Sequence, residues 1–179
     1  MRIEPLVLLA TAQLALAQPG GELPTASFRA EHAEVLEELD EVAADAGRLT
    51  SLPKAEQRAQ MRRIVAFFED EIAPHAAWEE EVLYPLVDRL AGGGEHAFTA
   101  TMRHEHDVVA ERIGELRREA SRAEPDPREF MRKTDRLLGL LTAHFSSEEQ
   151  VLLPLIDRSM TRAEYERAVS AARPPRASK

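Results

Sequence analysis

Cysteine is absent from this chain of 179 residues, and several kinds of structure are excluded with it. Without thiols there are no disulfide bridges, no thiolate-ligated zinc sites and no cysteine-held iron–sulfur clusters. Any metal ion must therefore be bound through nitrogen and oxygen ligands.

Aromatic side chains are also scarce, and the 23 basic residues are outnumbered by 32 acidic ones. The formal net charge is −9 and the pI is about 5.2, so the acidic surface repels phosphate backbones and we expect no nucleic-acid partner. Aromatic residues make up 5%, while alanine, leucine, glutamate and arginine dominate, a mixture that favours helices. The 44% hydrophobic and 31% charged residues are typical of one globular domain.

The apolar run Leu6–Leu16 is too short to span a bilayer, which needs roughly 20 residues. It follows Arg2 and includes the start of Ala15-Leu16-Ala17, and this order is typical of a secretory signal peptide. We therefore expect a signal peptide at residues 1–17, a linker at residues 18–25, and export to the periplasm or the extracellular space. The alternative is a cytoplasmic protein whose N-terminal segment forms a helix on the rest of the fold.

Helical periodicity occupies the remainder of the chain, and no strand pattern competes with it. The expected helical segments are residues 26–48, 54–90, 95–122 and 128–158. Three prolines lie inside these segments, so we expect kinks or breaks at Pro74, Pro85 and Pro154. The predicted fold is all-α, an up-down-up-down four-helix bundle over residues 26–160, with a short helix and a disordered basic tail in residues 161–179.

The helical region contains an internal repeat. His75–Arg89 aligns without gaps on His144–Arg158, and nine of the fifteen positions are identical. Upstream, Glu31-His32 matches Glu105-His106. The chain is therefore two copies of one helical hairpin.

Each repeat carries a histidine and a glutamate four positions apart, His75 with Glu79 and His144 with Glu148. Four residues turn a helix by about 400°, so both side chains of a pair emerge on one face. A single pair of this kind is commonly a solvated contact on a helix surface. Its recurrence in both repeats favours a binding site.

The predicted turns place four histidines at one level of the bundle. His32 and His75 are equidistant from the first turn, and His106 and His144 are equidistant from the third. The midpoint between His75 and His106 falls at residues 90–91, next to the glycine run of the second turn. Residues equidistant from the turn of an antiparallel hairpin share a height, so these side chains meet at one cross-section.

Such a cluster would be buried among aliphatic side chains, where a carboxylate must be neutralised or bind a cation. Imidazole and carboxylate without thiolate suit iron, manganese or zinc. Ferritin-like diiron proteins carry Glu-x-x-His, with glutamate first and a spacing of three. The opposite order and the spacing of four disfavour a ferritin-like site here.

The pattern H…HxxxE…H…HxxxE resembles the hemerythrin-like, or HHE cation-binding, family from Phe28 to Arg158. The resemblance implies a non-haem diiron centre with two iron ions, manganese or zinc being less expected, whose glutamates bridge the metals. It also implies a small ligand: dioxygen, peroxide or nitric oxide. The implied metal ligands are His32, His75, Glu79, His106, His144 and Glu148.

The chain departs from the oxygen-carrying hemerythrins, which have a fifth histidine and an aspartate in the last helix. Glu148 stands where a His-x-x-x-x-Asp spacing is expected, and no second histidine lies four residues from His106. These departures disfavour reversible oxygen storage. Iron handling and oxygen or redox sensing remain possible functions. The alternative is a diiron enzyme that reduces peroxide or nitric oxide. Of these, we prefer a non-enzymatic metal protein.

Several neighbours of the predicted ligands need a separate interpretation. His104 lies about 200° around the helix from His106, so both cannot point inward, and the repeat favours His106. Glu80 and Glu149 follow the predicted ligands by one position, and we expect solvated side chains there, with an outer-shell role as the alternative. Tyr84 is expected to pack in the core or at its rim, with a redox role as the alternative.

Overall fold

The computed structural model describes residues 22–94 and 96–170, and every regular element within these ranges is helical. The predicted signal peptide, residues 18–21 of the predicted linker and residues 171–179 of the predicted tail lie outside the described residues. The helices are α1 (Ala26–Arg48), α2 (Lys54–Phe67), α3 (Ala73–Trp78), α4 (Tyr84–Ala91), α5 (Ala100–Ala120), α6 (Pro127–Ser147), α7 (Leu153–Ser159) and α8 (Arg162–Ser170). Short segments join some of them: η1 (Leu49–Ser51), η2 (Phe68–Ile72), η3 (Glu79–Leu83) and η4 (Glu148–Leu152).

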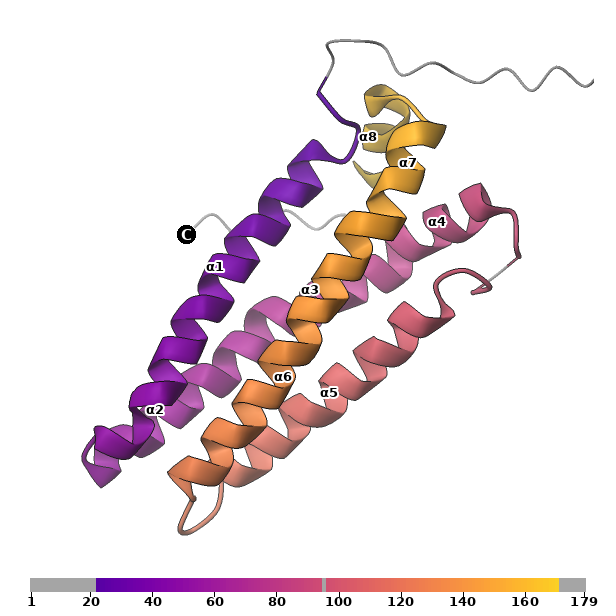
Figure 1. Ribbon diagram of the computed structural model, residues 1–179. Helices are drawn as coiled ribbons and strands as arrows, with labels where there is room; N and C mark the ends of the chain where they lie inside the picture. The colour runs from indigo at the N-terminus through magenta and orange to yellow at the C-terminus, as the bar shows by residue number, and fades with distance from the viewer. Residues whose placement is uncertain (1–21, 95, 171–179) are drawn as a thin grey trace, which may run out of the picture.

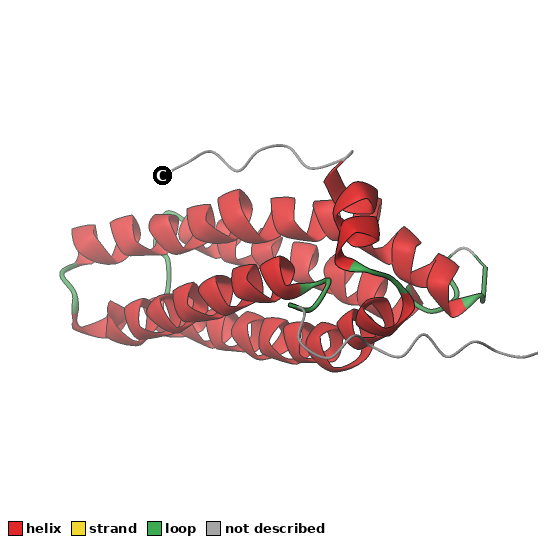
Figure 2. Cartoon of the chain, turned by 90° about the horizontal axis from the view of Figure 1, so that it is seen from above, coloured by secondary structure: helices red, strands yellow, loops and turns green. Residues whose placement is uncertain are grey.

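The long helices lie side by side in a bundle (Figures 1 and 2). Helix α6 contacts α1 and α5, while α2 contacts α1 and α5, and α4 contacts α7 toward the other end. Helix α8 follows a short turn after α7 and contacts η3. In the described part of the chain, no helix is both long and apolar enough to cross a membrane.

The prolines inside the long helices do not end them. The turn before each one is π-helical instead: η2 precedes Pro74, η3 precedes Pro85 and η4 precedes Pro154. The residue just before each proline donates its N–H to the carbonyl five positions earlier. Because a proline lacks an N–H and its ring collides with the carbonyl four residues earlier, a wider turn relieves the collision. The predicted kinks or breaks therefore take the form of π-helical turns.

The third helix begins later than the sequence indicates, at Ala100 rather than near residue 95. Helix α4 ends at Ala91, and the φ of 73° at the next residue, Gly92, is the left-handed conformation that glycine adopts readily. The buried carboxylate of Asp88 then accepts hydrogen bonds from the backbone N–H groups of His96, Phe98 and Thr99. These contacts hold the connection in a turn until α5 starts.

Two apolar clusters fill the bundle at different levels. On α1, Phe28 belongs to one cluster and Val35 to the other, and His32 lies between them. On α5, His106 lies in the same way between Met102 and Val109. Full burial of such apolar side chains contributes about 1.5–3 kcal/mol each. The two clusters therefore fix the helices around a buried polar layer.

Candidate metal centre

The six residues predicted as metal ligands meet in this polar layer, and each comes from a different place in the fold. Helices α1, α3, α5 and α6 each supply one histidine, while the two glutamates begin the π-helical segments η3 and η4. Both glutamates are fully buried, and the histidines are buried or nearly so. The residues brought together are His32, His75, Glu79, His106, His144 and Glu148.

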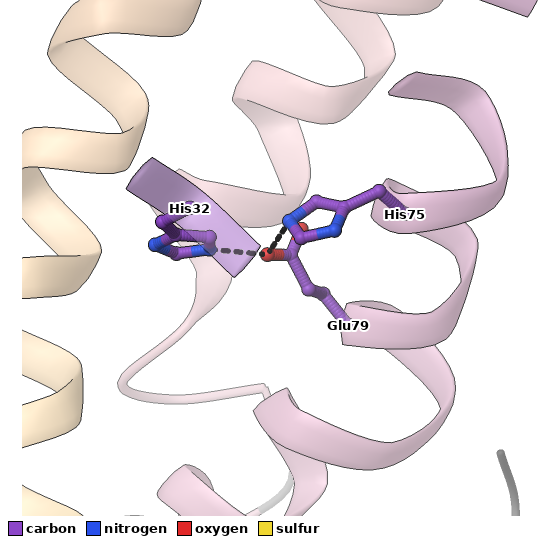
Figure 3. A group of neighbouring side chains, drawn as sticks. All are labelled: His32, His75 and Glu79. Carbon is purple, nitrogen blue, oxygen red and sulfur yellow. Dashed lines mark ion pairs between the residues drawn. The ribbon is translucent and has the colours of Figure 1, made fainter. Parts of the chain in front are cut away.

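Glu79 joins two groups of histidines. Its Oε1 lies 2.8 Å from Nε2 of His75 and 3.6 Å from Nε2 of His32 (Figure 3). Its Oε2 lies 3.2 Å from Nε2 of His106, which is 3.0 Å from Nε2 of His144. Within each group, the possible ligand atoms all lie within 4.8 Å of one another. One carboxylate thus presents one oxygen to each of two possible cation positions.

Glu148 also faces a histidine from each group. Its Oε2 lies 3.5 Å from Nε2 of His32, and its Oε1 lies 3.7 Å from Nε2 of His144. Oε1 also accepts a hydrogen bond of 2.8 Å from the hydroxyl of Tyr84. The two glutamates therefore occupy similar positions in the cluster, but only Glu148 receives this tyrosine hydrogen bond.

The two buried carboxyl groups have opposite pKa shifts. Burial alone would raise the pKa of Glu79, but the charge of His75 and the polar contacts of His106 and His32 outweigh it and hold that pKa well below its ordinary value. Burial and the nearby charge of Glu79 raise the pKa of Glu148 well above its ordinary value. Without a cation, the pair favours one charged and one protonated carboxyl group.

The cluster fits a bound cation on the evidence of its own polar atoms. Among the described residues, several buried atoms here face ring nitrogens or carboxylate oxygens but make no hydrogen bond of good geometry: His32 Nε2, Glu79 Oε1 and Oε2, and Glu148 Oε2. Buried polar atoms left in this state are costly, and a metal ion would satisfy them. Burial also lowers the pKa of His144, which favours the neutral imidazole that binds metals. The nitrogen and oxygen donors suit iron, manganese or zinc.

Carboxylates outside the cluster contact the other ring nitrogen of three histidines. These pairs are His32 Nδ1 with Glu149 Oε1 at 2.9 Å, His106 Nδ1 with Glu80 Oε1 at 3.1 Å, and His144 Nδ1 with Glu105 Oε2 at 2.8 Å. A proton on Nδ1 serves this contact and leaves the Nε2 lone pair for the cluster. The side chains of Glu80 and Glu149 are partly solvated, with 40% and 26% of their surface exposed, but their contacts with the histidines support the alternative of an outer-shell role.

The remaining neighbours divide between the surface and the centre. His104 is exposed, whereas His106 is buried in the cluster. Tyr84 is fully buried, and its hydroxyl oxygen lies 3.2 Å from Nε2 of His106 and 3.4 Å from Nε2 of His144. The sequence did not indicate this contact, because the equivalent position of the other repeat is Leu153.

Aromatic rings line the cluster on the side of His32 and His75. The ring of Phe28 stacks on that of His75, with centroids 5.5 Å apart and an interplanar angle of 3°. The ring of Phe145 lies 4.8 Å from that of His32. These apolar walls limit the access of water and strengthen electrostatic interactions inside the cluster.

Comparison with protein families gives a match to the hemerythrin HHE cation binding domain over residues 23–156. Comparison with curated proteins and with solved structures returned no significant match. The matched region covers most of the chain and contains the whole histidine and glutamate cluster. The chain belongs to the hemerythrin HHE cation-binding family.

Proposed function

We propose that this chain is an up-down-up-down four-helix bundle that holds a non-haem diiron centre. The proposed ligands are His32, His75, Glu79, His106, His144 and Glu148. The observation that carries the proposal is the position of Glu79, whose two oxygens face separate histidine groups. A carboxylate in this position suits a bridge between two cations, because each oxygen binds one of them.

Bound iron would supply a redox-active centre that takes dioxygen, peroxide or nitric oxide as a small ligand. The role of the chain is then ligand binding, redox sensing or iron handling. Its residues hold the imidazoles with Nε2 inward, and the rings of Phe28 and Phe145 limit the access of water. Without metal, the burial of Tyr84 and the nearby charge of Glu79 raise the pKa of its hydroxyl, which donates a hydrogen bond to Oε1 of Glu148.

Metal analysis of the purified protein tests the proposal. Protein produced with iron in the medium should contain about two iron ions per chain, the number that a pair of bridging carboxylates holds. It should also absorb in the near ultraviolet by charge transfer, which zinc cannot produce. The double variant His75→Ala, His144→Ala removes one histidine from each group, and its iron content should fall close to zero.

His104→Ala is the matched control, because it removes an exposed histidine from the helix that carries His106. It should keep the iron content of the wild type. An unchanged iron content in the double variant would overturn the assignment of the site. Wild-type protein that binds zinc or manganese but no iron would keep the site and overturn the diiron assignment.

The alternative function is a diiron enzyme that reduces peroxide or nitric oxide. The observation that favours it is the buried hydroxyl of Tyr84, which lies 3.2 Å from Nε2 of His106 and 3.4 Å from Nε2 of His144 while it donates its proton to Oε1 of Glu148. An enzyme would consume hydrogen peroxide or nitric oxide in the presence of a reductant, many times per chain. A carrier, sensor or iron-handling protein would show no turnover above that of the metal-stripped protein.

A further inference from the structure

A line of polar side chains runs from His32 away from the centre. The carboxylate of Glu149, which contacts Nδ1 of His32 through Oε1, is held on its other oxygen by Nη1 of Arg29. The same Nη1 donates a hydrogen bond of 3.3 Å to the backbone carbonyl of Glu149. Arg29 therefore holds both the side chain and the backbone of the residue that contacts His32.

The position of Arg29 is fixed in turn. Its Nε donates to Oγ1 of Thr25 at 3.1 Å, and its Nη2 donates to Oδ2 of Asp157 at 2.9 Å. The hydroxyl of Thr25 donates to Oδ1 of Asp157 at 2.9 Å, and the backbone N–H of Thr25 donates to the same oxygen at 3.1 Å. Thr25 is fully buried. We call the residues Thr25, Arg29, Glu149 and Asp157 the first clamp.

A similar arrangement, without the contact between arginine and aspartate, occurs around His106. Arg103 donates through Nη1 to the backbone carbonyl of Glu80 at 3.3 Å and through Nε to Oγ1 of Thr99 at 3.2 Å. Thr99 donates through its hydroxyl to Oδ2 of Asp88 at 2.8 Å. We call the residues Thr99, Arg103, Glu80 and Asp88 the second clamp.

Burial alone would raise the pKa of Asp88, but hydrogen bonds from Thr99 and its neighbours hold this pKa below its ordinary value.

Each clamp crosses between the two hairpins. Thr25 and Arg29 precede His32 in α1, whereas their partners Glu149 and Asp157 belong to the second hairpin. In the second clamp the hairpins exchange roles: the second hairpin supplies the threonine and arginine, and the first hairpin supplies the glutamate in η3 and the aspartate in α4. The spacing Thr-x-x-x-Arg-x-x-His appears in both helices. Most of these contacts thus form twice, from two different stretches of sequence. The contact between Arg29 and Asp157 has no counterpart, because Nη2 of Arg103 has no hydrogen-bond partner among the described residues.

We propose that the two clamps are positioning devices for the metal centre. Each holds a glutamate of one hairpin against Nδ1 of a histidine of the other, so that Nε2 faces the cations. Each clamp has residues from both hairpins. The cation site is therefore complete only when the two hairpins pack against each other. The inference rests on the proposed function, since it needs a cation at the centre.

The guanidinium group explains why the clamp contains arginine. Arg29 donates in several directions at once, to Thr25, Glu149 and Asp157, and its planar fork is rigid. Glu149 is 26% exposed, and without this contact its side chain would be free to turn into solvent. Removal of an outer residue that orients a metal ligand typically lowers metal affinity about 10–100-fold.

Cobalt(II) binding to the metal-stripped full chain tests the proposal. The variant Arg29→Met should bind cobalt more weakly than the wild type, by up to the roughly 10–100-fold that loss of a direct partner of a metal ligand causes. Its visible cobalt spectrum should change, because His32 is no longer held in one orientation. The rise in unfolding temperature on adding cobalt should also shrink. Arg48→Met, at an exposed arginine in the last turn of the same helix, is the control and should leave all three unchanged.

A merely structural role of Arg29 gives a different result. The unfolding temperature would then fall equally with and without cobalt, while the affinity and the spectrum stayed those of the wild type, and this would overturn the proposal. If Arg29→Met does not fold, the same measurements on Glu80→Gln test the second clamp, because Glu80 contacts Nδ1 of His106. Glu81→Gln, at an exposed neighbouring position, is the control for this variant. Wild-type protein that binds neither cobalt nor iron would instead overturn the proposed function.

Discussion

The hydroxyl of Tyr84 donates a hydrogen bond of 2.8 Å to Oε1 of Glu148, which belongs to the other hairpin. Its counterpart in the second repeat is Leu153, which has no hydroxyl. The two halves of the cluster therefore differ: Glu148 accepts from a buried phenol, while the position equivalent to the phenol on the side of Glu79 is aliphatic.

Replacement of Tyr84 by phenylalanine should destabilise the metal-free protein. Oε1 of Glu148 would lose its hydrogen bond while remaining buried, which costs about 1–3 kcal/mol. The loss should be smaller in the metal-loaded protein, because a bound cation satisfies the same carboxylate. Denaturant unfolding with and without metal measures both values. Equal stability of the variant and the wild type without metal would contradict the role of this hydrogen bond.

The two buried glutamates should differ in their importance for metal retention. Glu79 faces His32, His75 and His106, so Glu79→Gln should remove most of the metal at both positions. Glu148→Gln keeps Glu79 in place and should leave a larger part of the metal bound. Metal content after dialysis against a chelator compares the variants. Greater loss in Glu148→Gln than in Glu79→Gln would show that Glu148, and not Glu79, is the more important of the two bridging carboxylates.

Acid should release the metal, because protons compete for the histidine nitrogens. Burial lowers the pKa of His144, so this imidazole stays neutral at pH values where an exposed histidine is already protonated. Release should therefore need a lower pH than the ordinary histidine value of about 6.5. Metal retained after dialysis at stepped pH gives the curve. Release already complete at neutral pH would contradict this expectation.

Glu119 should stabilise the turn between α5 and α6 in a pH-dependent way. Its buried carboxylate accepts from the backbone N–H of Asp126 and from Lys133, and these hydrogen bonds outweigh burial and lower its pKa. Because this pKa is lower in the folded protein than in the unfolded chain, the charged carboxylate stabilises the fold at pH values above the ordinary carboxyl pKa. This stabilisation is lost as the pH falls through the pKa of the folded protein. Glu119→Gln should thus cost about 1.5–3 kcal/mol at neutral pH and progressively less in acid.

The exposed Glu124 provides the control for this experiment. Glu124→Gln should change the free energy of unfolding by less than about 0.5 kcal/mol at any pH, as surface substitutions usually do. Urea unfolding at neutral and acidic pH measures both variants. A cost of Glu119→Gln that does not change with pH would show that the charge of the carboxylate is unimportant.

Export remains a proposal that protein chemistry can test. If residues 1–17 are a signal peptide, the mature protein should begin at Gln18, after the sequence Ala15-Leu16-Ala17. N-terminal sequencing of the protein from its native cells measures this directly. A mature chain that still carries Leu6–Leu16 would exclude cleavage at this site.

Local patterns in the chain predicted much of the fold. The first helical segment, residues 26–48, agrees with α1 at both ends, because an apolar stripe and a clear turn bound it. The third segment was placed too early, since the sequence around residue 95 does not show that Asp88 collects the N–H groups of the connection. The π-helical turns at the prolines were expected only as kinks or breaks.

The sequence by itself determined the all-helical class, the two repeats and the level at which His32, His75, His106 and His144 meet, because helical periodicity and turn residues are local properties. Only the tertiary structure decided which side chains surround those histidines. Glu149 and Tyr84 act on residues of the opposite hairpin, at a distance of more than sixty positions along the chain. Such contacts depend on how each helix is rotated against its neighbours, and that rotation is set by the packing of the two apolar clusters above and below the polar layer.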